Sequence, residues 1–171
     1  LLNEVGEVLQ ENFDGKFTNL IDKADKSAVK LVRLIYENFP GFRDTALYKG
    51  QEIFFLKRAQ ILVADLWGAC RNTRTKEVYL DCCDFYDMEK LTMFPDYRVP
   101  QVLRHAGVLE YSVDLCKKIA EPIPSEEKNI GDENYDNRMI PIGSEYEVEI
   151  RAASVQACCG IKDELARLGK D

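Results

Sequence analysis

Lys57-Arg58-Ala59-Gln60-Ile61-Leu62-Val63-Ala64-Asp65-Leu66-Trp67 is the stretch from which the fold of this chain can be worked out. Three further apolar residues precede it, so the segment is apolar almost all round, which predicts a central, buried helix. At helical spacing Arg58 and Asp65 nevertheless share one face. Burying charge is costly unless the charge is paired or has a use. Two interpretations stay open: an internal Arg58–Asp65 ion pair that orients the helix, or a helix that forms one wall of a polar pocket.

The rest of the chain is mainly helical in its pattern. Helical spacing of apolar residues, together with Gly, Pro and Ser at the ends, predicts helices at residues 1–13, 17–24, 27–39, 88–93, 100–105, 111–120 and 144–168. Ser112 is expected to cap the helix at residues 111–120, and Ser144 to Glu147 forms a capping box. Residues 46–48 and 52–54, on either side of Lys49-Gly50, are compatible with one small β-hairpin. Strands and helices do not alternate, so the fold class is all-α.

Length and composition describe a chain that can form a core. The 171 residues are 46% hydrophobic, so we expect a single helical domain over residues 1–171. Residues 121–142 are rich in Pro, Glu, Asn and Asp and lack periodicity, which indicates a mobile surface loop. The first residue falls inside a predicted helix without a start signal, so we expect the chain to be a fragment of a longer protein.

Charge and cysteine usage restrict the classes of partner. The net charge of −7 argues against a groove for bulk nucleic acid, although a local basic pocket could still hold one phosphate. The sequence contains no apolar run of membrane-spanning length. The six cysteines include no C-x-x-C, so zinc spacing is missing and neither a metal nor a cofactor is expected. Such a scattered set suits a reducing compartment, and we expect a cytoplasmic protein. The sequence does not indicate an oligomeric state.

Carboxylate chemistry is the form of catalysis that the sequence favours. The single histidine, His105, is expected at the surface near a helix end, so a histidine-dependent nucleophile is disfavoured. Asp96 follows Pro95 and precedes Pro100, which places it at the positive end of a predicted helix. Asp96 is therefore either a simple N-cap or a catalytic carboxylate. Asp65, Asp87 and Glu149 are further candidates of the same kind.

Three separated segments resemble motifs of the queuosine salvage family, the queuosine 5′-phosphate N-glycosylase/hydrolases. They are residues 55–67, 91–101 and 147–152, and the flanks at 37–44 and 107–112 agree in order and spacing. The resemblance covers nearly the whole chain and matches the central to C-terminal part of the family's chain. Members of the family are longer at both ends. Pro95 also stands where a small residue such as alanine is expected, and the loop at 121–142 is longer than usual.

The resemblance implies a helical fold akin to DNA glycosylases and hydrolysis of queuosine 5′-phosphate to queuine and ribose 5-phosphate. In that case Asp96 is catalytic, and the substrate, a small nucleoside monophosphate, is bound by Lys57, Phe94, Tyr97 and Arg98, with Lys57 at the 5′-phosphate. A supporting network, expected to be buried, consists of Arg58, Asp65, Glu149 and Arg151. The alternatives are a non-catalytic helical interaction module and a DNA glycosylase-like enzyme, and the acidic balance disfavours the second.

Overall fold

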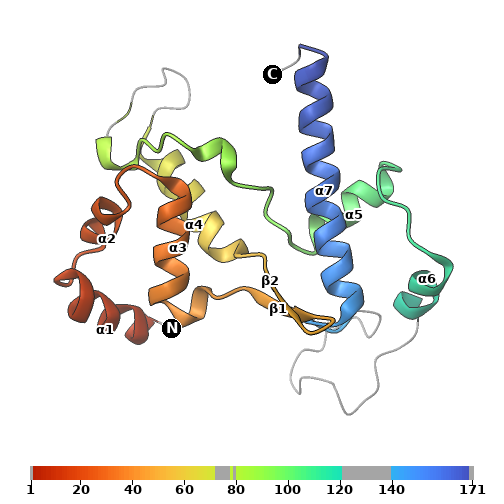
Figure 1. Cartoon of the computed structure of the whole chain (residues 1–171), viewed down its shortest axis with the longest axis horizontal. Coiled ribbons are helices and arrows are strands. Elements are labelled where there is room, and N and C mark those ends of the chain that lie inside the picture. Colours follow the sequence, from red (N-terminus) through yellow and green to blue (C-terminus); the bar gives the residue numbers. More distant parts are fainter. Residues whose placement is uncertain (1, 72–77, 79, 121–139, 170–171) are drawn as a thin grey trace. The chain divides into compact units, whose positions relative to one another are not determined.

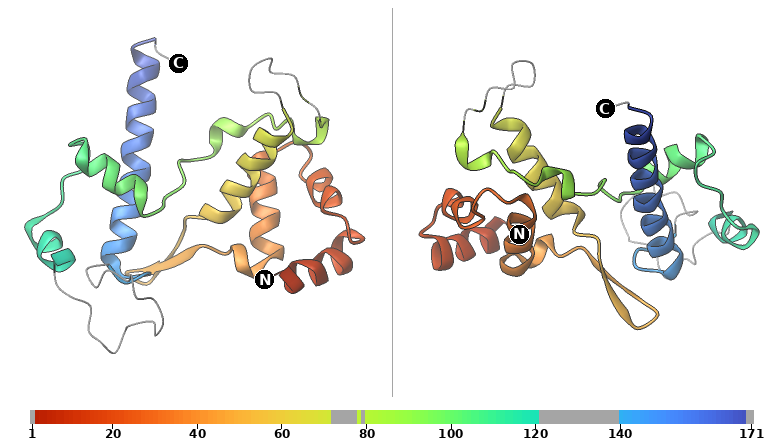
Figure 2. Two further views of the ribbon diagram at one scale, coloured as in Figure 1. Left: turned by 180° about the vertical axis from the view of Figure 1, so that it is seen from behind. Right: turned by 45° about the horizontal axis from the view of Figure 1, so that its top comes forward.

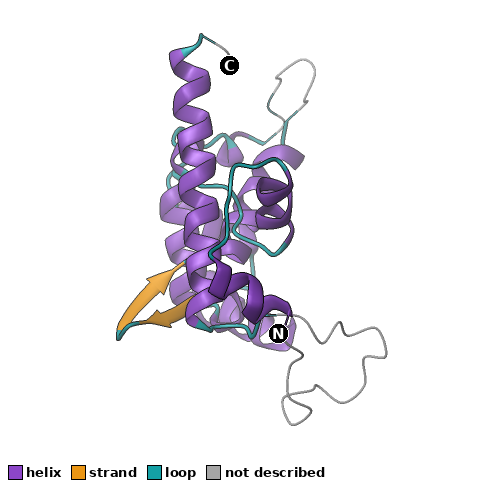
Figure 3. Cartoon of the chain, turned by 90° about the vertical axis from the view of Figure 1, so that its right-hand side faces the viewer, coloured by secondary structure: helices purple, strands orange, loops and turns teal. Residues whose placement is uncertain are grey.

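The computed structural model describes residues 2–71, 78, 80–120 and 140–169. Helices predominate and one pair of strands accompanies them, which confirms the predicted all-α class with a small hairpin (Figure 3). The chain divides into two compact units, one formed by residues 1–45 and 54–94 and the other by residues 46–53 and 95–171. A single domain over residues 1–171 stays a prediction. The mobile loop expected at 121–142 lies, over residues 121–139, outside the described residues.

The first unit is built around two helices that lie side by side, α3 (Ala28–Asn38) and α4 (Lys57–Ala69) (Figures 1 and 2). Before them come α1 (Leu2–Phe13) and α2 (Phe17–Lys23). Three short 3-10 turns complete the unit: η1 (Pro40–Phe42), η2 (Asp81–Cys83) and η3 (Met88–Lys90). The predicted helix at residues 88–93 is therefore wrong beyond residue 90. Thr92 donates its backbone N–H to Oε1 of Gln60 at 3.0 Å, which withdraws that group from helical pairing.

One apolar core holds this unit together. Its fully buried members include Leu20, Leu31, Ile35, Phe39 and Val63, so α2, α3 and α4 all contribute. Only one face of α4 enters the core, since Ala59, Gln60 and Val63 are its buried residues. The predicted central helix is therefore present, but it is buried along one face only. A helix that packs against α3 along one face can leave charged side chains on the opposite face in water.

Asp87 connects η3 to the start of α3. The residue is 3% exposed, and its carboxylate accepts hydrogen bonds from the Ser27 hydroxyl at 2.7 Å and the Ala28 backbone N–H at 2.6 Å. Ser27, the N-cap of α3, in turn accepts the backbone N–H of Lys30 at 3.1 Å. A carboxylate that accepts two hydrogen bonds at the start of a helix stabilises that helix, which is a structural role and not a catalytic one. Asp87 thus holds the N-terminal end of α3 to the start of η3.

The second unit contains three helices and most of a hairpin. The strands β1 (Thr45–Tyr48) and β2 (Gln51–Phe54) are joined by Lys49 and Gly50, both with positive φ, as a tight hairpin requires. The helices are α5 (Arg98–His105), α6 (Val113–Ala120) and α7 (Glu145–Arg167), and α5 packs against α7. No helix among the described residues is long and apolar enough to span a membrane.

Both serine caps predicted in this unit are present. Ser112 accepts the N–H of Leu115 at 3.1 Å, and Ser144 accepts the N–H of Glu147 at 3.3 Å. The capping box at α7 has one departure from the usual pattern, because the Glu147 side chain accepts the N–H of Gly143, the residue before the cap. The N-terminal end of α7 is fixed on both sides of Ser144.

Candidate active site

Asp96 is separated from the first residue of α5 by Tyr97 and is half-buried. Its Oδ1 accepts the backbone N–H groups of Arg98 at 2.8 Å and Val99 at 3.0 Å, the first two residues of the helix. Pro100, the third, has no N–H to satisfy. Within the described residues both hydrogen bonds of Asp96 use Oδ1, which leaves Oδ2 without one. One oxygen therefore caps the helix while the other is available to a ligand.

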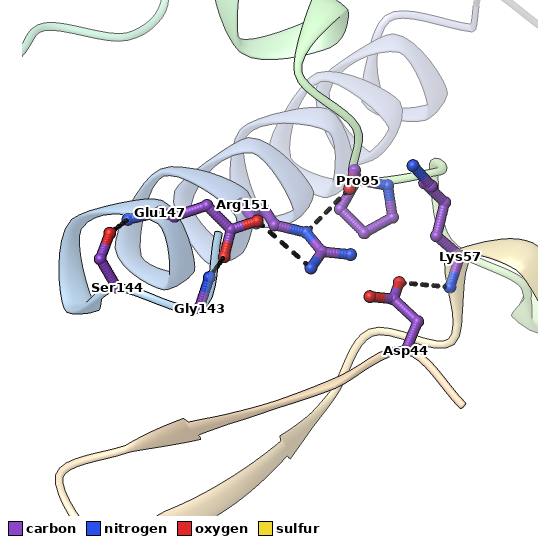
Figure 4. Close-up of polar contacts among 7 residues, drawn as sticks. All are labelled: Asp44, Lys57, Pro95, Gly143, Ser144, Glu147 and Arg151. Atoms are coloured by element: carbon purple, nitrogen blue, oxygen red, sulfur yellow. Dashed lines mark hydrogen bonds and ion pairs between the residues drawn. The ribbon is translucent and has the colours of Figure 1, made fainter. Parts of the chain in front are cut away.

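The peptide that precedes Asp96 is held by α7. Arg151, which is 8% exposed, donates from Nε to the carbonyl oxygen of Pro95 at 2.9 Å. Pro95 itself is fully buried. The guanidinium also faces Oε1 of Glu147 at 3.4 Å, one turn earlier on the same helix (Figure 4). Hydrogen bonds therefore link the start of α7, through Glu147 and Arg151, to Pro95, the residue that precedes Asp96.

Glu149 occupies a different place from the one expected. It is exposed, and its Oε1 accepts the hydroxyl of Tyr48 in β1 at 2.6 Å. The pKa of the neighbouring Lys49 is raised, first by a hydrogen bond of Lys49 itself with Tyr48, and the carboxylates of Glu145 and Glu149 contribute in the same direction. Glu149 thus joins the hairpin to the first turns of α7, while Glu147 is the carboxylate that pairs with Arg151.

Lys57 is the first residue of α4, after Leu56, which has a left-handed backbone with φ of 53°. Its backbone N–H donates to Oδ2 of Asp44 at 2.9 Å (Figure 4). The carbonyl of Asp44 accepts the N–H groups of Phe55 and Leu56, both at 3.0 Å. Because Asp44 already occupies the amide of Lys57, this residue can recognise an anion only through its side chain.

Arg58 and Asp65 do not form the expected buried pair. Both are exposed, and Arg58 donates to the carbonyl of Gly41 at 3.0 Å. Among the described residues no ion pair joins the two. The prediction of a buried network is therefore wrong for Arg58, Asp65 and Glu149, and Arg151 alone is buried. Exposed charges keep their hydration, so they need no internal partner.

The three residues expected to bind substrate beside Asp96 differ in exposure. Phe94 is half-buried, whereas Tyr97 and Arg98 are exposed. The guanidinium of Arg98 lies over the ring of Tyr97, with its carbon 5.1 Å from the ring centroid. An aromatic ring and a cation next to Asp96 suit a ligand that combines a planar base with a phosphate.

Glu147 and Asp44 are the residues that sequence reasoning missed. The spacing of four between Glu147 and Arg151 is a known signal for a helical ion pair, and it could have identified this partner. Asp44 could have been found from the hairpin register, which brings the residue before β1 opposite the residue after β2. Glu147 pairs with the side chain of Arg151, and Asp44 accepts the backbone N–H of Lys57. The sequence had already indicated both of these partners as candidates.

No metal-binding cluster of three or more His, Cys, Asp or Glu side chains occurs in the described part of the chain. The six cysteines are free, and burial raises the pKa of the Cys83 thiol well above its ordinary value, with its neighbours Cys70 and Cys82 adding to the shift. His105 is exposed at the end of α5, as predicted.

Comparison with known proteins finds several curated relatives that share one name. It is 42% identical over 168 residues to the queuosine 5′-phosphate N-glycosylase/hydrolase of Bos taurus, covering 98% of this chain and 43% of the relative. The proteins of the same name from Dictyostelium discoideum and Sphaerobacter thermophilus are each 42% identical. The first match covers 95% of this chain and 44% of the relative, and the second covers 99% and 46%.

The chain thus spans less than half the length of the curated relatives it matches. The family model described as queuosine salvage protein matches residues 1–171. The match extends over both compact units and includes Lys57, Asp96 and Arg151. On this basis the chain belongs to the queuosine salvage protein family.

Proposed function

We propose that this chain carries part of the active site of an N-glycosyl hydrolase that acts on queuosine 5′-phosphate. The reaction would release queuine and ribose 5-phosphate, and so return queuine for tRNA modification. Support comes from the printed names of relatives that are 42% identical over nearly all of this chain. The structural observation that carries the proposal is the Asp96 carboxylate, held through Oδ1 at the start of α5 with Oδ2 unoccupied by the described residues.

The chemistry of N-glycosyl hydrolysis suits such a carboxylate. The bond between the sugar C1′ and the base nitrogen breaks, its electron pair leaves with the base, and positive character develops on the sugar. A fixed carboxylate stabilises that charge and orients or deprotonates the water whose oxygen bonds to C1′. In ordinary purines a ring nitrogen can be protonated to help the base leave, and the 7-deazaguanine base lacks this nitrogen. The leaving base must take its proton at another atom, so more of the barrier falls on Asp96.

Cationic and aromatic side chains of the chain would bind the remainder of the substrate. We assign the 5′-phosphate to Lys57, and the base and sugar to the neighbourhood of Phe94, Tyr97 and Arg98. The cationic amine of queuine would find acidic and aromatic groups in a chain with a net charge of −7. We place the reaction in the cytoplasm, where the six free cysteines would stay reduced.

The decisive experiment measures base release by the complete polypeptide that contains this chain. Queuosine 5′-phosphate, the unphosphorylated nucleoside and DNA are compared as substrates. We expect release from the phosphate monoester, weaker release from the nucleoside and none from DNA. Lack of release from the first two would support a non-catalytic module, and release from DNA would support the DNA glycosylase alternative.

Asp96→Asn tests the catalytic assignment directly. Asparagine keeps the shape of the side chain and its ability to cap α5, but removes the charge. Turnover should fall at least about a hundredfold, the scale of losing one preorganised electrostatic group. Asp114→Asn, at an exposed aspartate in the first turn of α6, is the matched control and should leave turnover unchanged. Normal turnover in a folded Asp96→Asn protein would exclude Asp96 as the catalytic carboxylate.

A further inference from the structure

Arg151 is the one strongly buried cation among the charged residues considered for this site. Its side chain is 10% exposed, and that of its partner Glu147 is 22% exposed. A guanidinium is costly to bury, so its bonds must be well made for the fold to keep it there. One of them runs to a backbone carbonyl on a different segment, that of Pro95. Arg151 therefore fixes a specific peptide of the loop before α5.

That peptide is the one that leads into Asp96. The carbonyl of Pro95, the amide nitrogen of Asp96 and the Cα of Asp96 lie in one plane, because the peptide bond is planar. Holding the Pro95 oxygen at 2.9 Å therefore restrains the position from which the Asp96 side chain extends. The far end of that side chain is restrained by the N–H groups of Arg98 and Val99. Asp96 is held at its backbone from α7 and at its carboxylate from α5.

Glu147 connects this arrangement to the cap of α7. One oxygen of its carboxylate faces Arg151, and the other accepts the N–H of Gly143 (Figure 4). The order of Glu before Arg at a spacing of four is the favourable one for a helical ion pair. The direction of the Arg151 side chain is thereby set by a group that is itself fixed at the helix start.

We propose that Glu147 and Arg151 are positioning residues that aim the Asp96 carboxylate by holding the Pro95–Asp96 peptide. This inference rests on the proposed function, in which Asp96 is the catalytic group. Neither residue needs to touch substrate in this role. A small displacement of a catalytic group lowers the rate of the chemical step much more than it weakens substrate binding.

The test substitutes the pair within the complete polypeptide that contains this chain, with queuosine 5′-phosphate as substrate. Arg151→Lys keeps the charge but loses the planar group that serves both Pro95 and Glu147. We expect kcat to fall about ten- to hundredfold while KM changes less than about threefold. Glu147→Gln keeps an oxygen for Gly143 but loses the charge, and should lower kcat in the same direction by a smaller factor. Thermal unfolding followed by circular dichroism verifies that each variant is folded.

The chain offers matched controls on the same helix. Arg167 and Glu164 form an exposed ion pair near the C-terminal end of α7, with Arg167 Nε 2.8 Å from Oε2 of Glu164. Arg167→Lys and Glu164→Gln repeat the same chemical changes away from Asp96, and should leave kcat and KM unchanged. These controls distinguish the effect of losing an ion pair on α7 from the effect of losing the hydrogen bond between Arg151 and Pro95.

A third arm places Arg151→Lys in the Asp96→Asn background. If Arg151 acts through the Asp96 carboxylate, the second substitution should lower the residual kcat by less than about threefold. An equal loss with and without the carboxylate would overturn the inference in favour of a general structural role. So would a normal kcat in folded Arg151→Lys. If that variant does not fold, a normal kcat in Glu147→Gln overturns the inference by itself.

The outcomes also separate this inference from the proposed function. A normal kcat in Arg151→Lys together with a strongly reduced kcat in Asp96→Asn would overturn the positioning role and leave Asp96 catalytic. A normal kcat in Asp96→Asn would remove the catalytic assignment, and the positioning role would be overturned with it.

Discussion

The amide of Lys57 is capped by Asp44, so only the side chain remains for binding an anion. Lys57→Ala removes that side chain and leaves the cap intact. We expect KM for queuosine 5′-phosphate to rise about tenfold or more, the scale of losing one charge-assisted hydrogen bond, with little change for the unphosphorylated nucleoside. Steady-state kinetics on both substrates measure this. Lys30→Ala, at an exposed lysine in the first turn of α3, is the control. Equal losses on the two substrates would indicate a structural role for Lys57.

Asp87 illustrates a carboxylate that the sequence offers as a catalytic candidate and the structure uses as a cap. Asp87→Ala would leave the Ala28 N–H and the Ser27 hydroxyl without their buried partner. The free energy of unfolding should fall by about 3 kcal/mol, as expected when hydrogen bonds to a buried charged group are lost. Chemical denaturation gives the value. Asp22→Ala, at an exposed position on α2, should change it by less than about 0.5 kcal/mol. Similar small losses in both variants would contradict the capping role.

At the scale of elements, the hairpin depends on the backbone of its turn. Gly50 has φ of 82° and Gly160, within α7, has a helical backbone, yet a Cβ added at either would meet no atom within 4 Å. Whether a Gly→Ala change raises or lowers the free energy of unfolding is then decided by the backbone conformation alone. Gly50→Ala should lower the free energy of unfolding by about 1 kcal/mol, and Gly160→Ala should raise it by up to about 1 kcal/mol. Thermal unfolding of the two variants side by side checks both signs. Stabilisation by Gly50→Ala would contradict the positive φ at this turn.

Local signals in the sequence were sufficient for the elements and their ends. Ser112 and Ser144 cap the helices they were predicted to cap, and Lys49-Gly50 forms the expected turn. The extent of burial could not be predicted in the same way. The apolar character of α4 suggested burial all round, but the neighbour that covers a face is chosen by tertiary packing, and α4 buries one face only. The end of η3 likewise depends on Gln60, which lies 32 residues away from Thr92 along the chain.

For the candidate site, the sequence supplied the residue types and the structure supplied their partners. The motif around Asp96 identified a constrained helix entrance, and the structure confirms that this carboxylate stands at the start of α5. The bond between Arg151 and Pro95 joins residues 56 positions apart, so no local pattern contains it. Exposure of Arg58 and Asp65 was likewise beyond the reach of helical periodicity. Contacts between distant segments are the part of a site that composition and spacing do not determine.

At the scale of the whole molecule, charge separates the proposed reaction from that of a DNA glycosylase. Nucleic-acid affinity comes largely from cations that neutralise phosphates, and this chain carries 30 acidic against 23 basic residues. We therefore expect the 171-residue chain to show no binding to a short labelled duplex at concentrations up to about 100 µM, the weak limit of non-specific affinity at physiological salt. Fluorescence anisotropy at low and physiological salt measures this. Binding that weakens steeply as salt rises would reveal a basic face and favour DNA as the ligand. A flat anisotropy signal, combined with release of queuine from the nucleoside monophosphate, is the result that a small-molecule hydrolase should give.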